Sequence, residues 1–408
     1  METDMKILQI NTVCGVGSTG KIAAALLQLL KKKGHEGRIA YGVGEAKSAE
    51  PGEVYRIVSR QGYYAHNLLS RLTGREGRFS AAATKKLVAD IRAFDPDVIH
   101  LHNLHGHYLH YEVLFRYLAE AGKPVVWTLH DCWAMTGHCT HFMAVGCEKW
   151  KTGCDSCTQL RAYPACYTRG DVPGNYRKKK TVFTSLPDLT LVTPSRWLAD
   201  AAKASFLGRY PVRVIHNGID LSVFAPTDSG FRKKHRCEDK FVLLGVAFGW
   251  GTRKGLDVFV ELAKRLDGRY KIVLVGTDDA VDKQLPDSIL SIHRTQDQRE
   301  LAELYTAADL LVNPTREDNF PTVNLEALAC GTPVLTFRTG GSPEAIDESC
   351  GAVVACGDVD AMEAQIRRIE KERPFTAEAC IRRAAAFDAG GRFEEYIRLY
   401  EALADKQE

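Results

Sequence analysis

Short runs of aliphatic and β-branched residues alternate with stretches of helical periodicity along almost the whole chain. This alternation is typical of parallel α/β sheets, in which each strand is followed by a helix that covers one face. A polar break at 228–240 divides the alternation into two halves. The sequence therefore predicts two doubly wound α/β domains, and 408 residues are enough for two cores. Strands are expected at 6–12, 37–42, 97–103, 124–130, 189–195, 212–218, 241–247, 270–276, 309–314 and 333–337, and helices at 20–33 and from Leu256, about Gln298 and Pro321.

Charge and composition exclude several classes of protein. The net charge is only +3, which argues against a nucleic-acid binder, and no window approaches 18 uninterrupted apolar residues. The first six residues have no apolar signal core, so we expect a cytoplasmic protein. Twelve cysteines in a reducing compartment favour metal ligands or buried thiols over disulfides. Two basic clusters, 177–180 and 232–235, are interpreted as solvated loops, with peripheral contact to an anionic membrane face or a lipid-linked acceptor as the alternative.

A pair of acidic residues flanks a predicted helix start in the second half. Asp318 and Glu326 lie on either side of Pro321, which suits the first helical turn because it has no amide hydrogen to leave unpaired. The peptide amides at 319–323 then point outward with the positive end of the helix dipole, and this arrangement binds anions. The pattern suits a nucleotide sugar, whose hydroxyls donate to the carboxylates and whose diphosphate meets the amides. On spacing alone, helix capping is the alternative.

The stretch DNFPTVNLEALACGTPV at 318–334 resembles the retaining glycosyltransferases of family 4, which have the GT-B fold. Further stretches at 215–224, 253–266, 340–346 and 394–403 fall in family order. The match departs from the family in having Asp318 rather than Glu, with Glu317 one position early. The resemblance implies two Rossmann-like domains facing a cleft: an acceptor-side domain at 1–210 and a nucleotide-sugar-binding domain at 211–390. It also implies a helix at 391–408 that crosses back to the first domain.

The same resemblance assigns roles to individual residues. It implies Lys254 as the cation for the donor phosphates and His130 as a contact to the sugar near the reacting centre. Asp318 and Glu326 complete the predicted catalytic set as acids that bind hydroxyls. Arg253 is the expected substitute for an arginine that the family often has about six residues before the lysine. The predicted donor site comprises Gly15, Gly17, Ser18, Arg253, Lys254, His293, Arg294, Asp318, Asn319, Phe320, Pro321, Thr322, Val323 and Glu326.

The glycine-rich loop TVCGVGSTGKI at 12–22 fits two phosphate-binding patterns incompletely. A P-loop would have a hydroxyl where this chain has Ile22, and a dinucleotide loop would have an acid at the end of the second strand, whereas Glu36 precedes that strand. The family resemblance implies instead a turn in which Gly15, Gly17 and Ser18 border the active site. A purely structural strand-to-helix turn and a true nucleotide site are the alternatives.

Five histidines occur at 100, 102, 105, 107 and 110. Alternation along a strand sends His100 and His102 to one face, whereas the other three belong to a loop and a helix start. We therefore expect contacts to the acceptor rather than a metal site, and the acceptor-side residues are His102, Asn103 and His105. The nearby 95–97 segment spells a metal-binding DxD motif, but Pro96 precedes the strand and so lies at the end of the sheet where ligands do not bind.

Four cysteines, Cys139, Cys147, Cys154 and Cys157, lie in an insertion at about 132–175 that lacks apolar periodicity. A Cys-x-x-Cys pair with two further thiols suits tetrahedral zinc, and an ion would explain how such an insertion holds its shape. Reduced thiols without metal are the alternative. Further candidate ligands are Cys132, Cys166, His138 and His141.

The resemblance implies a metal-independent, retaining hexosyltransferase of polysaccharide biosynthesis. Its substrates would be a nucleoside diphosphate sugar and a glycan or lipid-linked glycan acceptor, and its chemistry would need no cofactor. A nucleotide-sugar 2-epimerase of the same fold is the first alternative. An oxidoreductase that uses the glycine loop and a zinc-organised scaffold without donor binding are the others.

Overall fold

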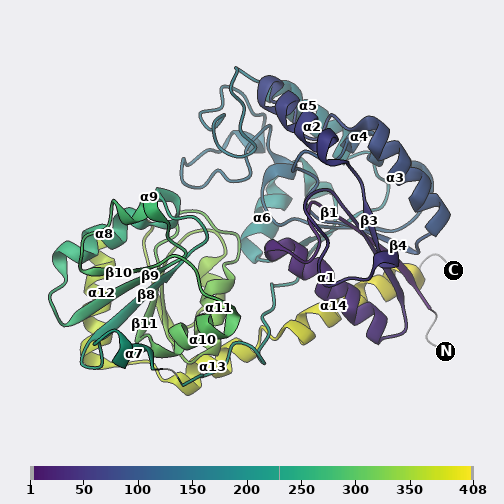
Figure 1. Ribbon diagram of the computed structural model, residues 1–408. Helices are drawn as coiled ribbons and strands as arrows, with labels where there is room; N and C mark the ends of the chain where they lie inside the picture. The colour runs from purple at the N-terminus through teal and green to yellow at the C-terminus, as the bar shows by residue number, and fades with distance from the viewer. Residues whose placement is uncertain (1–3, 229, 406–408) are drawn as a thin grey trace. The chain divides into compact units, whose positions relative to one another are not determined.

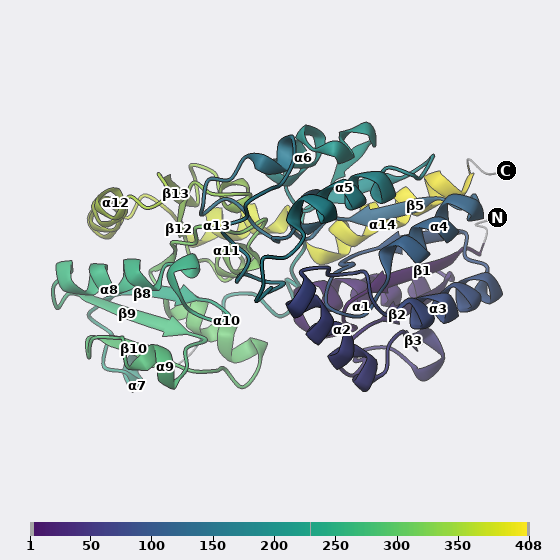
Figure 2. The same cartoon turned by 90° about the horizontal axis from the view of Figure 1, so that it is seen from above.

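The computed structural model describes residues 4–228 and 230–405 of the chain, and these residues form two compact units. Unit 1 comprises the chain up to Ile215 together with the C-terminal segment from Phe393, and unit 2 comprises His216–Arg392. Each unit is a parallel sheet with helices on both faces (Figures 1 and 2). The prediction of two doubly wound α/β folds is therefore confirmed.

Unit 1 contains a seven-stranded parallel sheet with the order β3-β2-β1-β4-β5-β6-β7. Side chains alternate between its two faces, so that Leu8 and Ile10 pack in one core and Ile7 in another. The strands are β1 (Lys6–Asn11), β2 (Glu36–Tyr41), β3 (Val54–Arg56), β4 (Val98–Leu101), β5 (Val125–Thr128), β6 (Thr190–Thr193) and β7 (Val212–Val214). The helices are α1 (Gly17–Lys32), α2 (Arg60–Thr73), α3 (Ala81–Phe94), α4 (Tyr111–Ala121), α5 (Val172–Phe183) and α6 (Arg196–Ala204).

Unit 2 repeats the plan with six parallel strands in the order β10-β9-β8-β11-β12-β13. Leu243 packs with α8 and α12 on one face, and its neighbours Val242 and Leu244 pack with α10 and α11 on the other. The strands are β8 (Phe241–Val246), β9 (Tyr270–Val275), β10 (Ile289–Ile292), β11 (Leu310–Asn313), β12 (Val334–Phe337) and β13 (Gly351–Val354). The helices are α7 (Phe231–Lys234), α8 (Leu256–Arg265), α9 (Asp279–Asp282), α10 (Gln298–Ala307), α11 (Thr322–Ala329), α12 (Val359–Glu372) and α13 (Ala377–Ala385).

The last helix, α14 (Ala389–Ala404), returns the chain to unit 1. Its apolar stripe packs with α1 and with strands of the unit 1 sheet, and the yellow helix lies beside α1 in Figure 1. Tyr400 is fully buried, and its hydroxyl lies 2.7 Å from Nδ1 of His100 on β4. The expected helix that crosses back to the first domain is confirmed, and α14 is an integral part of the unit 1 core.

The two basic clusters are not the solvated loops that the sequence suggested. Residues 177–180 lie on α5, where Lys179 is buried and its Nζ donates to the carbonyl oxygens of Trp133 and Thr136 at 2.7 and 3.1 Å. In the second cluster, Arg232 lies on α7 and pairs with Asp309 at 2.6 Å. Within the described residues, no helix combines the length and apolar character that crossing a bilayer requires.

The Tyr400 contact with His100 gives a test of how firmly α14 stabilises unit 1. We expect Tyr400→Phe to reduce the free energy of unfolding by about 1–3 kcal/mol, because Nδ1 of the buried His100 loses its partner. Tyr400→Ala should cost about 3–5 kcal/mol because it also leaves a cavity. Urea unfolding measures both changes, with the exposed Arg398→Ala on the same helix as control. Equal stability of all four proteins would contradict this role of α14.

Candidate active site

The acidic pair lies on the loop between β11 and α11, in the middle of the unit 2 sheet. Helix α11 begins at Thr322, and Pro321 is the residue just before it rather than the first helical residue that we expected. Asp318 is half-buried on the loop, whereas Glu317 is buried at 5% exposure. The acid available at the surface is therefore Asp318, although Glu is usual at this place in the family.

Lys254 and Asp318 meet in the structure, although 64 positions separate them in the sequence. The Nζ of Lys254 lies 2.6 Å from Oδ2 of Asp318, and both side chains are about one-fifth exposed. Gly255 makes this approach feasible: its φ is +78°, and a Cβ there would lie 2.5 Å from the carbonyl oxygen of Pro314. The turn after β8 thus packs directly against the loop after β11.

Arg316 fastens these two loops together. Its amide donates to the carbonyl oxygen of Arg253 at 2.9 Å, and its guanidinium forms two 2.8 Å hydrogen bonds with the carboxylate of Asp257. A bidentate pair of this kind fixes orientation as well as distance. The position of Lys254 is therefore set by backbone and side-chain bonds on either side of it.

Glu326 is held from the opposite direction, by α10. The hydroxyl of Tyr305 donates to Oε2 of Glu326 at 2.8 Å. Burial, followed by the charge of Glu326, holds the pKa of Tyr305 well above its ordinary value, so the phenol remains a donor. Glu326 is half-buried on the first turns of α11, with one oxygen committed to Tyr305. This geometry orients the carboxylate before any ligand arrives.

The other predicted donor residues divide into three groups. Asn319, Phe320 and Pro321 are buried, and the Phe320 ring packs 4.9 Å from His216, so a ligand would meet their backbone rather than their side chains. Thr322 and Val323 are half-buried at the start of α11. The remaining three predicted donor residues of unit 2 are exposed: Arg253, Arg294 and His293. The ring of His293 binds the carboxylate of Asp282 at 2.6 Å.

The glycine loop of unit 1 follows β1 and enters α1 at Gly17. Gly15 has a φ of +69°, and a Cβ there would lie 2.0 Å from the carbonyl oxygen of Lys47. Close backbone packing therefore explains why position 15 is a glycine. Gly17 also has a positive φ, of +63°, but faces open space, and Ser18 beside it is exposed. Gly17 and Ser18 are the part of this loop that a ligand can approach.

A chain of hydrogen bonds fixes the protonation pattern of His130, which follows β5. Nε2 of Gln9 donates to the carbonyl oxygen of Ala23, so Oε1 of Gln9 faces Nε2 of His102 at 3.1 Å and accepts its proton. Nδ1 of His102 is then the acceptor for Nε2 of His130, 3.0 Å away. Burial lowers the pKa of His130 to about 4, so the ring is neutral at pH 7 and its Nδ1 is an acceptor.

As we expected, the histidines do not converge on a single point. His105 binds the carboxylate of Asp131 at 2.7 Å and lies 3.1 Å from the hydroxyl of Tyr163. Although burial raises the pKa of Asp131, the nearby His105 holds it at about 2. His100 points toward α14, and His110 is the residue just before α4, where its side chain forms no capping hydrogen bond. The rings of His100 and His102 do share a face, with centroids 4.0 Å apart.

His107 belongs to a separate cluster with Glu76 and His66, whose candidate ligand atoms lie within 4.8 Å of one another. Glu76 already accepts hydrogen bonds from the amides of Gly106 and His107 and from the hydroxyl of Ser70. A carboxylate satisfied in this way orders the loop that carries the histidines. The DxD segment is likewise structural, because Asp97 accepts from the amide of Lys6 at the beginning of β1.

Several residues of these networks were not predicted from the sequence. Gln9, Glu76, Tyr163 and Tyr305 support the predicted residues, and each lies outside any recognisable motif. Phe248, on the loop after β8, is fully exposed.

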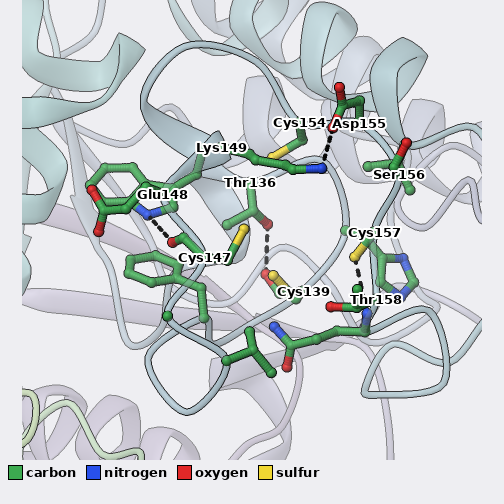
Figure 3. Close-up of a pocket in the computed structure, with 17 residues that line it drawn as sticks. Thr136, Cys139, Cys147, Glu148, Lys149, Cys154, Asp155, Ser156, Cys157 and Thr158 are labelled. Atoms are coloured by element: carbon green, nitrogen blue, oxygen red, sulfur yellow. Dashed lines mark hydrogen bonds and ion pairs between the residues drawn. The ribbon is translucent and has the colours of Figure 1, made fainter.

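The predicted zinc ligands Cys139, Cys147, Cys154 and Cys157 all line one pocket of unit 1 (Figure 3), whereas Cys132 and Cys166 do not line it.

Known proteins resemble both units. The model of the family described as Glycosyltransferase Family 4 matches residues 19–223, half of the chain, and that described as Glycosyl transferases group 1 matches residues 239–372. WcaC of Escherichia coli K12, whose name assigns it to colanic acid biosynthesis, is 27% identical over 98% of this chain and 100% of its own. D-inositol 3-phosphate glycosyltransferase of Mycolicibacterium paratuberculosis is 33% identical over 44% of this chain and 43% of its own.

Solved structures share the fold at low sequence identity. HepE of Anabaena in complex with UDP has a TM-score of 0.68 at 15% identity, and the match covers 98% of this chain and 100% of HepE. Sucrose-phosphate synthase of Thermosynechococcus elongatus has a TM-score of 0.69 at 18% identity, with 98% and 99% coverage. This likeness confirms the GT-B fold.

The buried histidines of unit 1 predict that acid destabilises the protein. Burial lowers the pKa of His66 and His130 to about 4, and those of His100 and His102 well below the ordinary value of 6.5. Below pH 6.5 the unfolded chain therefore binds more protons than the folded one, so stability falls as the pH falls. Each histidine should contribute a slope approaching ~1.4 kcal/mol per pH unit.

Urea unfolding at pH 7.5, 6.5 and 5.5 measures this slope. His100→Asn should make it shallower, whatever its effect on absolute stability, because one titrating group is gone. His293→Asn is the control: hydrogen bonding to Asp282 raises the pKa of His293, so its loss cannot flatten the slope. An unfolding free energy that does not change between pH 7.5 and 5.5 would contradict the prediction.

Proposed function

Because the chain belongs to glycosyltransferase family 4, we propose that it transfers a hexose from a nucleoside diphosphate sugar to a hydroxyl of a glycan or lipid-linked glycan, with retention of the anomeric configuration. Similarity to WcaC along the full length of both chains supports a setting in polysaccharide biosynthesis. We propose that the reaction takes place in the cytoplasm, at the inner face of a membrane that carries the acceptor.

The ion pair between Lys254 and Asp318 carries this proposal. It joins the loops after β8 and β11, and so gathers a cation and a carboxylate beside the amides at the start of α11. Phosphate oxygens bind both lysine and the amino end of a helix. Lys254 would bind the diphosphate, while Asp318 and Glu326 would accept hydrogen bonds from sugar and ribose hydroxyls.

The proposed chemistry depends on fixed charge around the leaving group. Negative charge develops on the departing diphosphate, and Lys254 with the helix amides stabilises it without reorganising. These protein groups supply the positive charge, so the proposal assigns no metal ion to the reaction. A double displacement would need a carboxylate behind the sugar carbon. Asp318 and Glu326 are assigned to hydroxyls instead, and we therefore favour attack from the front face with the leaving phosphate as base.

The acceptor side of the proposal rests on unit 1. His102, Asn103 and His105 follow β4, and His130 follows the adjacent β5. We propose that His130, which is neutral and donates to His102, contacts the donor sugar rather than acts as an acid. The exposed Gly17 and Ser18 would lie beside the substrates.

A thermal-shift panel tests the donor, because a ligand that binds only the folded state raises the melting temperature. UDP and UDP-glucose, which are named in HepE structures, are the first members, followed by the other nucleoside diphosphates and their hexoses. One base and one sugar should stand out. The anomeric proton of the product, observed by NMR, should show the configuration of the donor, and inversion would contradict the retaining mechanism. Donor alone, incubated with enzyme, should yield no 2-epimer.

Lys254→Ala should reduce kcat/KM on the order of 100-fold and weaken binding of the diphosphate, because the leaving group loses its cation. Glu326→Ala should abolish the rise in melting temperature that the nucleotide sugar produces in the wild-type chain. The matched control is Lys264→Ala, which removes an exposed lysine of the same unit. Full activity of Lys254→Ala, with donor binding intact, would refute the assignment.

A further inference from the structure

The insertion between β5 and α5 has almost no regular structure. In residues 132–171 the structure contains two short 3₁₀ turns, Trp133–Met135 and Lys149–Lys151, and no longer element. Even so, Trp150 and Phe142 are buried and stacked, with ring centroids 4.7 Å apart. A loop of this length needs a source of order beyond a few apolar contacts.

Four cysteines of this insertion surround one pocket of about 270 Å³. Figure 3 shows the side chains of Cys139, Cys147, Cys154 and Cys157 lining the hollow, each from a different turn of the loop except for the Cys154 and Cys157 pair. All four are free thiols. Cys139 is buried and the other three are half-buried, so solvent has limited access to the sulfurs.

The backbone around the pocket forms hydrogen bonds with two of the thiols. The amide of Gln159 donates to Sγ of Cys157 at 3.4 Å, and the backbone of Gly137 forms a hydrogen bond with the Cys154 thiol. Hydrogen bonds of this kind orient metal ligands. Gly137 permits this approach, because a Cβ there would lie 2.8 Å from Cβ of Cys154.

A histidine adds a nitrogen donor to the pocket. His138 is 3% exposed and lines the pocket with the cysteines, and its Nε2 has no hydrogen-bond partner. The backbone at Leu160 and Ala162 forms hydrogen bonds with the ring, and these must therefore involve Nδ1. A ring that donates from Nδ1 carries its lone pair on Nε2, which is the arrangement of a metal-binding histidine.

We propose that one structural zinc ion binds in this pocket with four ligands, drawn from the thiolates of Cys139, Cys147, Cys154 and Cys157 and the imidazole of His138. Soft thiolates with a neutral imidazole select zinc over magnesium or calcium. In the described part of the chain, no three of the four sulfurs lie within 4.8 Å of one another. A bound ion, with Zn–S bonds of about 2.3 Å, would therefore draw the turns of the loop together.

The ion would act on the active site indirectly. Tyr163 belongs to the insertion, and its hydroxyl lies 3.1 Å from Nδ1 of His105, which binds Asp131 next to His130. Thr136 lines the pocket, and Nζ of Lys179 donates to its carbonyl oxygen and to that of Trp133, just after that segment. Zinc would hold these acceptor-side groups in position, and it would take no part in the transfer reaction.

Metal analysis tests the site without any substrate, so its outcome is separate from that of the transfer reaction. The full chain, purified with an affinity tag that contains no histidine, should contain about one zinc per chain by mass spectrometry. X-ray absorption at the zinc edge should show a first shell dominated by sulfur at about 2.3 Å. The double variant Cys154→Ser, Cys157→Ser should lose the metal, whereas Cys356→Ser, which removes an exposed thiol of unit 2, should retain it.

Chelation provides a second measurement if the double variant fails to fold. Removing zinc from the wild-type chain should lower its melting temperature, and readdition of zinc, but not magnesium, should restore it. The proposal is overturned if the wild-type chain takes up no zinc from an equimolar solution. It is overturned equally if the double variant folds and keeps its zinc, or if the absorption spectrum shows no sulfur in the first shell.

Discussion

The parallel sheet imposes the constraint on which this protein is built. All carboxyl ends of its strands emerge at one edge, and the loops that leave the two central strands diverge to opposite faces, which opens a place for ligands. In unit 2 those strands are β8 and β11, and the loops after them carry Lys254 and Asp318. In unit 1 they are β1 and β4, and the loops after them carry Gly17 and His102. The candidate residues of each unit are therefore gathered by topology, before any specific side-chain contact is considered.

Side-chain contacts then refine what topology has gathered. Arg316 holds the turn that carries Lys254, and Tyr305 orients Glu326 from a neighbouring helix. In unit 1 a relay from Gln9 through His102 fixes which nitrogen of His130 carries its proton. Each of these supporting side chains is half-buried or buried, so it loses little further conformational entropy when a ligand binds. Such preorganisation is what electrostatic stabilisation of a leaving group requires.

The sequence was sufficient to predict the fold class and most of the central strands, because these depend on periodicity. The strands β3, β10 and β13 were not predicted: they lie at the edges of the two sheets and are only partly buried, so their apolar pattern is weak. Lys179 was expected in a solvated loop, and nothing in a run of four basic residues indicates which of them is turned inward. Glu76 and Gln9 were missed for a related reason: their roles depend on partners 30 and 93 residues away along the chain.

The path of the chain through the two units has a consequence for biosynthesis. Unit 2 is continuous, whereas unit 1 receives its final core helix only after all of unit 2 has been made. On the ribosome, unit 2 can therefore complete its core while the first 215 residues still lack the apolar surface of Tyr396, Ile397 and Tyr400. The face of α1 and the adjacent strands remain uncovered during that interval. The order of synthesis thus leaves unit 1 unfinished until α14 has been translated.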